Sequence, residues 1–455
     1  MLRKVLVANR GAVAARVIRA LAHMDIASVA VYSDADRDAP YLEMASEARR
    51  IGPAPAGESY LNQEALLACL KASGADALHP GYGFLSENAA FARRVIEAGA
   101  AFIGPSPSWI EDMGNKVNAR AVAARYGLPL MPGSGALEPG PALVEAGRRI
   151  GFPVLVKAAG GGGGIGMLPA HSEEELLAAA ERAGTLAQRF FGSGLIYLER
   201  LLDRPRHIEI QVLGDRHGNA MHVFERECSI QRRHQKVIEE APAPGLARDR
   251  IDGLAASTAA ELAAGGYDSL GTVEMLMDGD GNFSFLEMNT RLQVEHAVTE
   301  EVTGIDLVAT QIRIASGEPL GFTQADVPQR GHAIEFRINA EDAEREFRPA
   351  AGVVERYLAP GGPGVRMDSH LFAGYEVPPF YDSLLGKLIV WAPNREAAIE
   401  RSRVALAELV VEGLVTNVPI HEALLASEAF LEGRMTTNLL DRVGSAAFLA
   451  AAARV

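Results

Sequence analysis

The sequence is poor in cysteine and lacks any long apolar run. Its 455 residues include two cysteines, Cys69 and Cys228, too few for a disulfide framework and consistent with a reducing cytosol. No stretch approaches the ~18 apolar residues that a transmembrane helix needs. The apolar run within the opening MLRKVLVANRG is also too short for a secretory signal. We therefore expect a cytoplasmic protein that does not cross a membrane.

Basic residues are outnumbered by acidic ones. The chain has 44 Lys and Arg against 58 Asp and Glu, a formal net charge of −14. This balance disfavours a general binder of nucleic acid or of anionic membranes. An anionic small substrate would therefore need a local basic site. With 48% hydrophobic and 22% charged residues the composition is that of an ordinary globular protein.

The first region, residues 1–115, alternates strands with helices. KVLVANRGAVAARVIRAL predicts a strand, a turn around Gly11 and a helix. Further strand-then-loop units follow at IASVAVYSDAD, ADALHPGYGFLSEN and AAFIGPS. This alternation predicts a parallel, doubly wound α/β sheet. Because Gly11 is the only glycine in the first turn, a G-x-G-x-x-G dinucleotide fingerprint is not supported.

Two α+β regions are expected to follow, over residues 116–330 and 331–455. The second begins with the helical NKVNARAVAARYGLP, the strand FPVLVKAA, a glycine loop and a helix capped by Ser172. Several strands come next, and GTVEMLMD and FSFLEMNT are joined by the turn GDGN, which predicts a hairpin. In the third region, GHAIEFRINAED and LLGKLIVWA predict strands and NREAAIERSRVALAELVVEG predicts an amphipathic helix.

Five consecutive glycines, residues 160–164, follow Lys157. Composition alone would allow a flexible linker. The run contains no serine, however, and lies between a predicted strand and a predicted helix. Backbone N–H groups without side chains can cover phosphate oxygens, and Lys157 adds a positive charge. No Gly-Lys-Ser/Thr follows, so this is not a Walker P-loop, and the run predicts only an anion site.

The predicted hairpin carries acidic residues on one side. Side chains alternate along a strand, so Glu287, Asn289 and Arg291 share a side if the chain stays extended. Glu274 comes from the neighbouring strand. Two carboxylates and an amide oxygen suit a hard cation such as Mg²⁺. The alternative is a solvated polar face.

Two further polar stretches have ordinary and functional interpretations. In RHIEIQV, residues 206–212, the polar side chains alternate with apolar ones, which is more typical of an exposed strand face. The charged run at residues 231–240 is typical of a surface loop, although in an acidic protein a basic patch could bind an anionic substrate. The polar side chains concerned are His207, Glu209 and Gln211 in the first stretch, and Arg232, Arg233, His234 and Lys236 in the second.

NTRLQVEH and EFRIN each contain an arginine near a carboxylate. Arg291 could hold a planar oxyanion with two hydrogen bonds, and Glu295 beside it could act as a general base. Arg337 lies on the same strand side as Glu335 and Asn339. A structural ion pair is the alternative for each.

Taken together, these segments resemble the biotin carboxylase family of the ATP-grasp superfamily, specifically the separate subunit of bacterial acetyl-CoA carboxylase. The matching stretches run in order over nearly the whole chain and include HPGYGFLSENAAFA, FPVLVKAAGGGGGIGM, ERECSIQRRHQKVIEEAPAPG, FLEMNTRLQVEHAVTE and YDSLLGKLI. The resemblance implies an N-terminal doubly wound domain, an ATP-grasp domain with a glycine-rich lid at about residues 130–203, and a C-terminal domain. It implies a ligase that carboxylates biotin with bicarbonate through carboxyphosphate, releasing ADP and phosphate, as in fatty acid biosynthesis.

The resemblance also implies roles for individual residues. ATP would be bound by Lys116, Lys157, Gly162, Gly163, Gly164, Met167, Glu199, Arg200, Leu202, His207, Gln231, His234 and Leu276. Mg²⁺ or Mn²⁺ would be held by Glu274, Glu287 and Asn289. Bicarbonate and biotin would be seated by Lys236, Arg291, Gln293, Val294, Glu295 and Arg337. The catalytic residues would be Glu295, the base that deprotonates bicarbonate, with Arg291, Lys236 and Arg337, the last stabilising enolate-like biotin.

Partners follow from the same resemblance. No Met-Lys-Met biotin-attachment site precedes the end of the sequence, so a biotin carrier protein, shared with a separate carboxyltransferase, would hold the biotin. We expect a homodimer because Arg19 and Arg366 match interface positions, whereas His23 and Pro363 differ from that pattern. Ile165 stands where the family usually has Arg or Lys. The alternatives are a component of another acyl-CoA, pyruvate or urea carboxylase, a different ATP-grasp ligase, or a non-catalytic scaffold.

Overall fold

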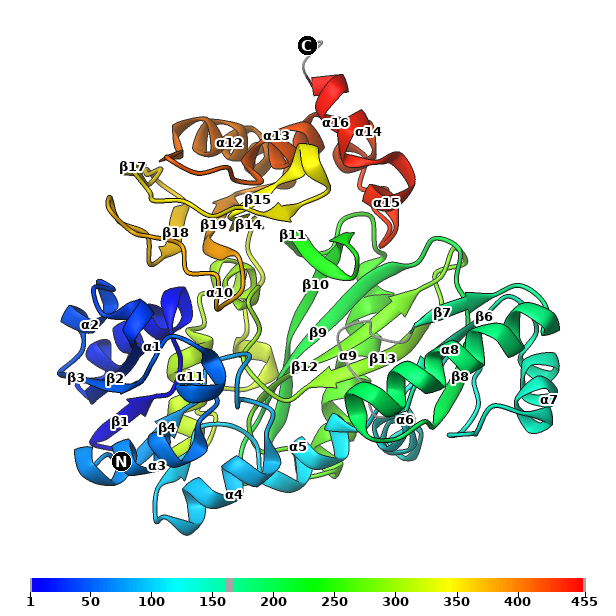
Figure 1. Cartoon of the computed structure of the whole chain (residues 1–455), viewed down its shortest axis with the longest axis horizontal. Coiled ribbons are helices and arrows are strands. Elements are labelled where there is room, and N and C mark those ends of the chain that lie inside the picture. The colour runs from blue at the N-terminus through cyan, green and yellow to red at the C-terminus, as the bar shows by residue number, and fades with distance from the viewer. Residues whose placement is uncertain (1, 160–166, 453–455) are drawn as a thin grey trace.

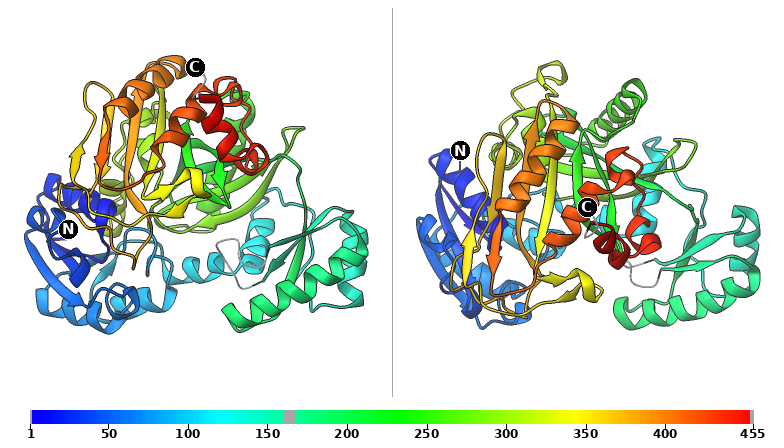
Figure 2. Two further views of the ribbon diagram at one scale, coloured as in Figure 1. Left: turned by 45° about the horizontal axis from the view of Figure 1, so that its top comes forward. Right: turned by 90° about the horizontal axis from the view of Figure 1, so that it is seen from above.

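The computed structural model describes residues 2–159 and 167–452 (Figure 1). Their strands form a five-stranded, an eight-stranded and a three-stranded sheet, with two short two-stranded ribbons. In this part of the chain no helix is both long and apolar enough to cross a membrane. Seen from two further directions, the three-stranded sheet and its helices project from the body on the side away from the N-terminal sheet (Figure 2).

The N-terminal sheet is parallel and doubly wound, as predicted. Its strand order is β3-β2-β1-β4-β5, and each neighbouring pair is parallel. Its strands are β1 (Lys4–Val7), β2 (Ala27–Ser33), β3 (Glu47–Gly52), β4 (Ala77–His79) and β5 (Ala101–Phe102). Its helices are α1 (Gly11–His23), α2 (Tyr41–Met44), α3 (Gln63–Ser73), α4 (Ala89–Glu97) and α5 (Pro107–Gly114).

The eight-stranded sheet is antiparallel throughout and joins the second and third predicted regions. Its order is β13-β12-β9-β10-β11-β14-β19-β18, and β11 pairs with β14 across the predicted division at residue 331. The ladder bonds therefore tie these two regions into one continuous wall. The strands are β9 (Arg206–Gly214), β10 (Ala220–Arg232), β11 (Gln235–Ala241), β12 (Leu270–Met277), β13 (Phe283–Asn289), β14 (His332–Asn339), β18 (Val365–Ser369) and β19 (Leu384–Ala392).

Helices cover both faces of this sheet. Buried side chains of α12 and α13, including Ile399 and Leu424, pack on Phe336 of β14 and its neighbours. Toward the N-terminal region, α10 packs Val298 against Ile389 of β19. The helices are α6 (Lys116–Arg125), α9 (Arg248–Ala264), α10 (His296–Thr303), α11 (Leu307–Ala315), α12 (Arg395–Glu408), α13 (Val418–Ala426), α14 (Glu428–Leu431), α15 (Leu439–Val443) and α16 (Ser445–Ala452).

The three-stranded sheet forms a smaller unit, with strand order β7-β6-β8 and antiparallel pairing. Its helices bury Leu143 and Leu176 against Val156 and Leu198 of the sheet. Ser172 caps the longer helix as predicted, since its side chain accepts a hydrogen bond from the Glu175 N–H. The elements are α7 (Pro141–Ile150), β6 (Val154–Ala158), β7 (Leu168–Ala170), α8 (Glu173–Phe191) and β8 (Ile196–Arg200).

Short elements complete the fold. In the described residues two ribbons lie in the C-terminal region, one between neighbouring segments and one between distant ones, and four turns of 3-10 helix lie in connections. The ribbons are β15 (Glu341–Asp342) with β16 (Arg348–Pro349), and β17 (Arg356–Leu358) with β20 (Val410–Glu412). The 3-10 turns are η1 (Asp34–Asp36), η2 (Ala56–Glu58), η3 (Gln324–Asp326) and η4 (Ala343–Arg345).

The charged run at residues 231–240 is a β-hairpin, so its interpretation as a surface loop is wrong. β10 and β11 pair antiparallel, and the turn between them is made by Arg233 and His234, whose φ angles are 48° and 65°. Exposure is confined to the tip of the hairpin, and Glu239 and Glu240 are buried in the sheet. Neighbouring ladders on both sides supply the strand environment that the local sequence does not reveal.

Candidate functional site

A cavity of about 620 Å³ lies between the eight-stranded sheet, the three-stranded sheet and the N-terminal region. Its sheet wall comes from β9 to β14 and from the loop that follows β13. The opposite wall comes from β6 and β8, and the N-terminal region contributes the loop after β4. The cavity therefore brings together residues from all three predicted regions.

The hairpin carboxylates face this cavity, so the alternative of a solvated polar face is wrong. Glu274 lies directly opposite Glu287 in the β12–β13 register. The Asn289 amide donates to Glu274 Oε1 at 2.9 Å, and Lys116 Nζ is 3.0 Å from Glu287 Oε2. Burial alone would raise the pKa of Glu274, but Lys236 and His207 hold it well below its ordinary value. The donor set is thus anionic and rich in oxygen, which suits Mg²⁺ or Mn²⁺.

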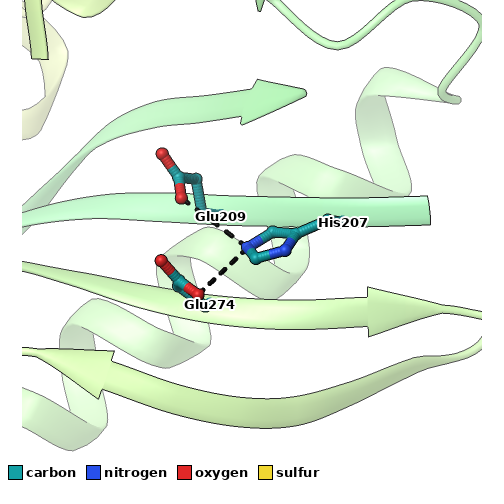
Figure 3. Close-up of side chains that lie close together, drawn as sticks. All are labelled: His207, Glu209 and Glu274. Carbon is teal, nitrogen blue, oxygen red and sulfur yellow. Dashed lines mark ion pairs between the residues drawn. The ribbon is translucent and has the colours of Figure 1, made fainter. Parts of the chain in front are cut away.

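β9 presents a second polar row into the same wall. His207 Nε2 is 3.1 Å from Glu274 and 3.8 Å from Glu209 (Figure 3). His207, Glu209 and Gln211 are all buried, because β9 has β10 and β12 on its two edges and packed residues on both faces. The interpretation of this row as an exposed strand face is therefore wrong.

Lys236 connects three carboxylates at the centre of the wall. Its ammonium donates to Glu209 at 2.6 Å, Glu274 at 2.9 Å and Glu295 at 2.5 Å. Burial lowers the pKa of a lysine, but these carboxylates raise the pKa of Lys236 well above its ordinary value. The ammonium is therefore charged at neutral pH and fixed in direction.

Glu295 has a second cation on its other oxygen. Arg337 donates to Glu295 Oε2 at 2.9 Å and to Glu239 at 2.5 Å. Burial alone would raise the pKa of Glu295, but Lys236, Arg337 and Arg226 lower it below the ordinary range. Glu295 is thus a buried, ionised carboxylate whose two oxygens are each held by a cation.

Arg291 lies beside this centre and connects it to the N-terminal region. Its guanidinium donates to Glu87 at 2.8 Å and to the Asn289 side-chain oxygen at 2.7 Å. Gln293, two residues on, donates to Glu274 at 2.7 Å. Arg291 and Arg337 therefore form ion pairs, as the structural alternative predicted, and both also line the cavity, so their functional role stays a prediction.

The opposite wall carries one buried cation. Lys157 of β6 pairs with Glu199 of β8, and Arg120 of α6 donates to the other Glu199 oxygen at 2.5 Å. Burial lowers the pKa of Lys157, and Lys116 lowers it further, whereas Glu199 raises it. Two ammonium groups, Lys157 of this wall and Lys116 of α6, thus line the cavity.

Every predicted site residue within residues 2–159 and 167–452 lines the cavity. Gly162, Gly163, Gly164 and Ile165 lie outside the described residues. The predicted basic patch is divided, since His234 and Lys236 line the cavity while Arg232 stacks over Phe347 at 4.8 Å. The lining residues from the prediction are Lys116, Lys157, Met167, Glu199, Arg200, Leu202, His207, Gln231, His234, Lys236, Glu274, Leu276, Glu287, Asn289, Arg291, Gln293, Val294, Glu295 and Arg337.

Sequence reasoning missed several lining residues. Tyr82 and Gly83 come from the loop at the carboxyl end of β4, the edge at which parallel sheets bind ligands. Asp382 and Ser383 immediately precede β19, where YDSLLGKLI changes from polar to apolar. Both signals are present in the sequence but weak, because many loops combine polar residues with glycine.

The cavity is suited to a polyanion beside a hard cation. Two ammonium groups lie on one side, a carboxylate and amide oxygen set lies next to them, and Lys236, Arg291 and Arg337 mark a second anion position. Apolar residues, including Met131, Leu202, Leu276 and Phe285, line the remainder. This arrangement suits transfer of a phosphoryl group, which depends on positioning and charge neutralisation.

Three family models match the chain in succession. "Biotin carboxylase, N-terminal domain" matches residues 1–110. "Carbamoyl-phosphate synthase L chain, ATP binding domain" matches residues 115–323. "Biotin carboxylase C-terminal domain" matches residues 335–442.

Relatives with related names are similar over nearly the whole chain. A biotin carboxylase of Pseudomonas aeruginosa is 49% identical over 447 residues, 97% of this chain and 98% of that protein. One of the pyruvate carboxylase subunits of Methanothermobacter thermautotrophicus is 48% identical over 97% of this chain and 90% of its own length.

Solved structures agree with the sequence comparisons. A biotin carboxylase–β,γ-ATP complex from Campylobacter jejuni has a TM-score of 0.95 at 44% identity, covering 97% of this chain and 99% of that one. A biotin carboxylase domain dimer of Hydrogenobacter thermophilus 2-oxoglutarate carboxylase, solved with MgADP, ADP and bicarbonate, has a TM-score of 0.93 at 44% identity, covering 97% and 98%.

Proposed function

The chain belongs to the biotin carboxylase family and is an ATP-dependent ligase, and from this premise we propose the following reaction and residue roles. The protein carboxylates N1 of biotin, which is carried on a separate protein, with bicarbonate and ATP. The observation that supports this best is the position of Glu295, between Lys236 and Arg337, in the cavity that also holds Lys116 and Lys157.

ATP would bind on the side of the cavity formed by the three-stranded sheet. Lys116 and Lys157 would exchange their carboxylate partners for phosphate oxygens. Leu202 and Leu276 would contact the adenine ring of ATP. The other described residues predicted to bind ATP, Met167, Glu199, Arg200, His207, Gln231 and His234, line the same cavity. Glu274, Glu287 and Asn289 would hold Mg²⁺ or Mn²⁺, which neutralises phosphate charge when bound.

Bicarbonate would bind beside Arg291, Gln293, Val294 and Lys236. Glu295 would accept its proton. In the ion-paired arrangement Glu295 is a weak base, because Lys236 and Arg337 stabilise its anion and lower its pKa. A bicarbonate or phosphate oxygen that draws these cations away would raise the pKa of Glu295 and so strengthen the base at the moment when it is needed.

Phosphoryl transfer and then carboxylation of biotin would follow. A bicarbonate oxygen attacks the γ-phosphorus, ADP leaves, and carboxyphosphate forms. Carboxyphosphate breaks into CO₂ and phosphate, and the phosphate accepts the N1 proton of biotin. N1 attacks CO₂, while Arg337 stabilises the negative charge on the biotin carbonyl oxygen. Enclosure by both walls would keep CO₂ from escaping before it reacts.

The proposal extends to partners and organisation. The biotin would be supplied by a biotin carrier protein that is shared with a separate carboxyltransferase. The homodimer would form at a second cavity, of about 450 Å³, that Arg19, His23 and Arg366 line.

ATP as substrate and two buried free cysteines fit a cytoplasmic enzyme. The three domains would span residues 1–115, 116–330 and 331–455.

The final carboxyl acceptor would be chosen by the carboxyltransferase. Relatives of nearly equal similarity are named as subunits or domains of pyruvate and 2-oxoglutarate carboxylases. We propose acetyl-CoA as the first acceptor to test, with propionyl-CoA, pyruvate and urea as the alternatives. Identification of the biotinylated protein that co-purifies with the chain would decide among them.

The reaction is tested by ADP release from the purified protein with Mg²⁺ and ATP. We expect release to require bicarbonate and to rise when free biotin is added. Release without bicarbonate, or stimulation by an amine in place of biotin, would instead indicate another ATP-dependent ligase. A purified protein that binds neither ATP nor bicarbonate would instead be a scaffold.

A further inference from the structure

Arg226 is a fully buried arginine behind the sheet wall of the cavity. It lies on β10 directly opposite Glu209 of β9, its side chain is 0% exposed, and it does not line the cavity. We infer that Arg226 is a positioning residue for the bicarbonate site. It sets the orientation of Gln293 and Lys236 and does not itself touch substrate. This inference rests on the proposed function and concerns the same site.

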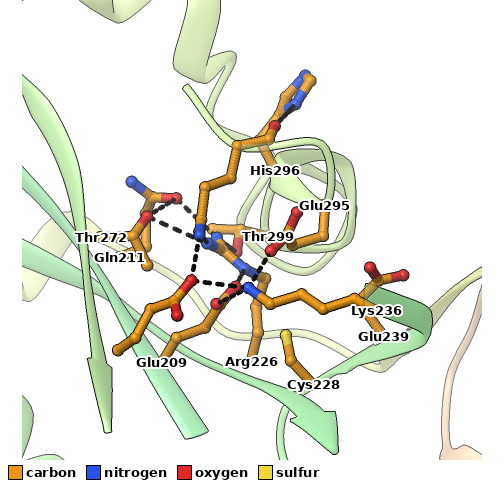
Figure 4. A network of polar contacts seen from close by, with 12 residues as sticks. Glu209, Gln211, Arg226, Cys228, Lys236, Glu239, Thr272, Glu295, His296 and Thr299 are labelled. Carbon is orange, nitrogen blue, oxygen red and sulfur yellow. Dashed lines mark hydrogen bonds and ion pairs between the residues drawn. The ribbon is translucent and has the colours of Figure 1, made fainter. Parts of the chain in front are cut away.

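Every N–H group of the Arg226 guanidinium has a partner. A guanidinium has five N–H donors in a fixed plane. Nε donates to Glu209 at 2.5 Å. One terminal nitrogen donates to Gln211 at 2.6 Å and Thr299 at 3.0 Å, and the other to Gln293 at 2.5 Å and Thr272 at 3.2 Å. Figure 4 shows the guanidinium at the centre of this network.

These contacts fix the orientation of the Gln293 side-chain amide. An arginine can only donate hydrogen bonds, so Gln293 must direct its oxygen toward Arg226. Its NH₂ group then points to the cavity side, where it donates to Glu274 at 2.7 Å. A flipped amide would place two donors against each other at Arg226. Arg226 therefore keeps the Gln293 NH₂ group on the cavity side, where the N–H that is not bonded to Glu274 can meet an oxyanion.

A second route connects Arg226 to Lys236. Glu209 accepts from Arg226 with one oxygen and from Lys236 with the other, at 2.6 Å. The two cations share this carboxylate, so the position of Glu209 limits the position of the Lys236 ammonium. Thr299 further ties Arg226 to α10, the helix that begins immediately after Glu295. One side chain thus connects the two bicarbonate contacts and the base.

Lysine cannot replace Arg226 in this role. A lysine would retain the charge beside Glu209 but has three donors on a single nitrogen, against five spread across a plane. At least two of the partners Gln211, Gln293, Thr272 and Thr299 would lose their donor. The Gln293 amide would then be free to adopt either orientation.

The test compares Arg226→Lys with Arg395→Lys in the full-length protein, by the KM for bicarbonate and for ATP in the ADP-release assay. Arg395 also donates to a buried carboxylate of the sheet, Glu240, but lies outside the cavity. We expect Arg226→Lys to raise the bicarbonate KM roughly 10- to 100-fold, with the ATP KM within about twofold. Arg395→Lys should change neither.

A double variant separates positioning from general loss of stability. In a Gln293→Ala background, Arg226→Lys should have a several-fold smaller effect on the bicarbonate KM, because the amide is gone. If the double variant raised the bicarbonate KM by the product of the two single-variant factors, the inference would be overturned. Thr299→Val, which removes one acceptor and keeps Arg226, should raise the bicarbonate KM about 2- to 5-fold and decides the matter if Arg226→Lys does not fold.

The inference and the proposed function fail in different ways. Wild-type protein without bicarbonate-dependent, biotin-stimulated ADP release would overturn the proposed function. Wild-type protein with that activity, together with an unchanged bicarbonate KM in Arg226→Lys, would overturn only the role of Arg226. An equal rise in the KM of bicarbonate and ATP would also overturn it, since a merely structural loss would affect both substrates.

Discussion

The two walls of the cavity are built on different principles. On the eight-stranded sheet, two central cations each have several partners: Lys236 contacts three carboxylates, and Arg226 uses all five of its donors. On the three-stranded sheet, Lys157 has one carboxylate partner, Glu199, and the core beneath it is a simple aliphatic cluster.

This difference separates positioning from binding. A charge with several fixed partners cannot rotate, so it is already aimed at a reacting group before substrate arrives. A charge with one partner can exchange it for a phosphate oxygen at little structural cost. We propose that the eight-stranded sheet fixes the site of bicarbonate chemistry and that the three-stranded sheet binds the nucleotide.

Replacement of the base should give the largest effect. Glu295→Gln keeps the shape but removes the proton acceptor, so we expect kcat for biotin-dependent ADP release to fall by about 10²- to 10⁴-fold. ATP binding, measured by fluorescence titration, should remain, because the proposed nucleotide contacts lie on other residues. Glu240→Gln is the matched control, since Glu240 is equally buried and paired but lies outside the cavity. Full turnover by Glu295→Gln would refute its role as base.

Loss of the buried lysine on the other wall should act on ATP alone. Lys157→Met removes one proposed phosphate contact and keeps roughly the length of the side chain, and we expect the ATP KM to rise roughly 10- to 100-fold. The bicarbonate KM should stay within about twofold. Arg148→Met, in an exposed ion pair with Glu173 on the same unit, should change neither value. A parallel rise in both KM values would remove the distinction between the walls.

The sequence predicted the strands of this site better than their surroundings. Period-two alternation identified β9, β12, β13 and β14, and the GDGN turn identified the hairpin that places Glu274 opposite Glu287. It could not show that β9 has neighbours on both edges and packing on both faces, so the row from His207 to Gln211 was expected to be exposed. Burial of a polar strand face depends on partners distant in sequence, which local alternation does not encode.

Arg226 illustrates the same limit more sharply. In FERECSIQ it is one charged residue among several, with nothing to distinguish it from a surface arginine. Its five partners come from β9, β12, α10 and the loop after β13, and α9, α10, α11 and β11 were not predicted at all. The motif residues proposed to touch substrate could be found from the resemblance, whereas a residue proposed to act through them, such as Arg226, required the packed structure.

The smallest predicted effect concerns the stability cost of concentrating charge on one wall. Glu335 of β14 lies opposite Glu239 of β11, near Lys387 at 3.4 Å, with Arg337 and Glu295 also close. Burial raises the pKa of Glu335 to about 8, from an ordinary value of 4.5, although Lys387 opposes the shift. The folded protein therefore keeps a proton that the unfolded chain releases, and the stabilisation is complete below pH 4.5 and lost as pH rises through 8.

Glu335→Gln cannot titrate, so its stability should fall less than that of wild type as pH rises from about 6 to about 8. The slopes of unfolding free energy against pH should differ between wild type and Glu335→Gln by at most about 1.4 kcal/mol per pH unit. The measurement is urea unfolding at a series of pH values. Glu173→Gln on α8 is the control, because the Arg148 partner lowers the pKa of Glu173 and the group is ionised throughout this range. Parallel profiles of stability against pH for wild type and Glu335→Gln would show that Glu335 causes no pH-dependent loss of stability. A pH-dependent difference seen with Glu335→Gln and not with Glu173→Gln would place that loss on the wall proposed to position bicarbonate.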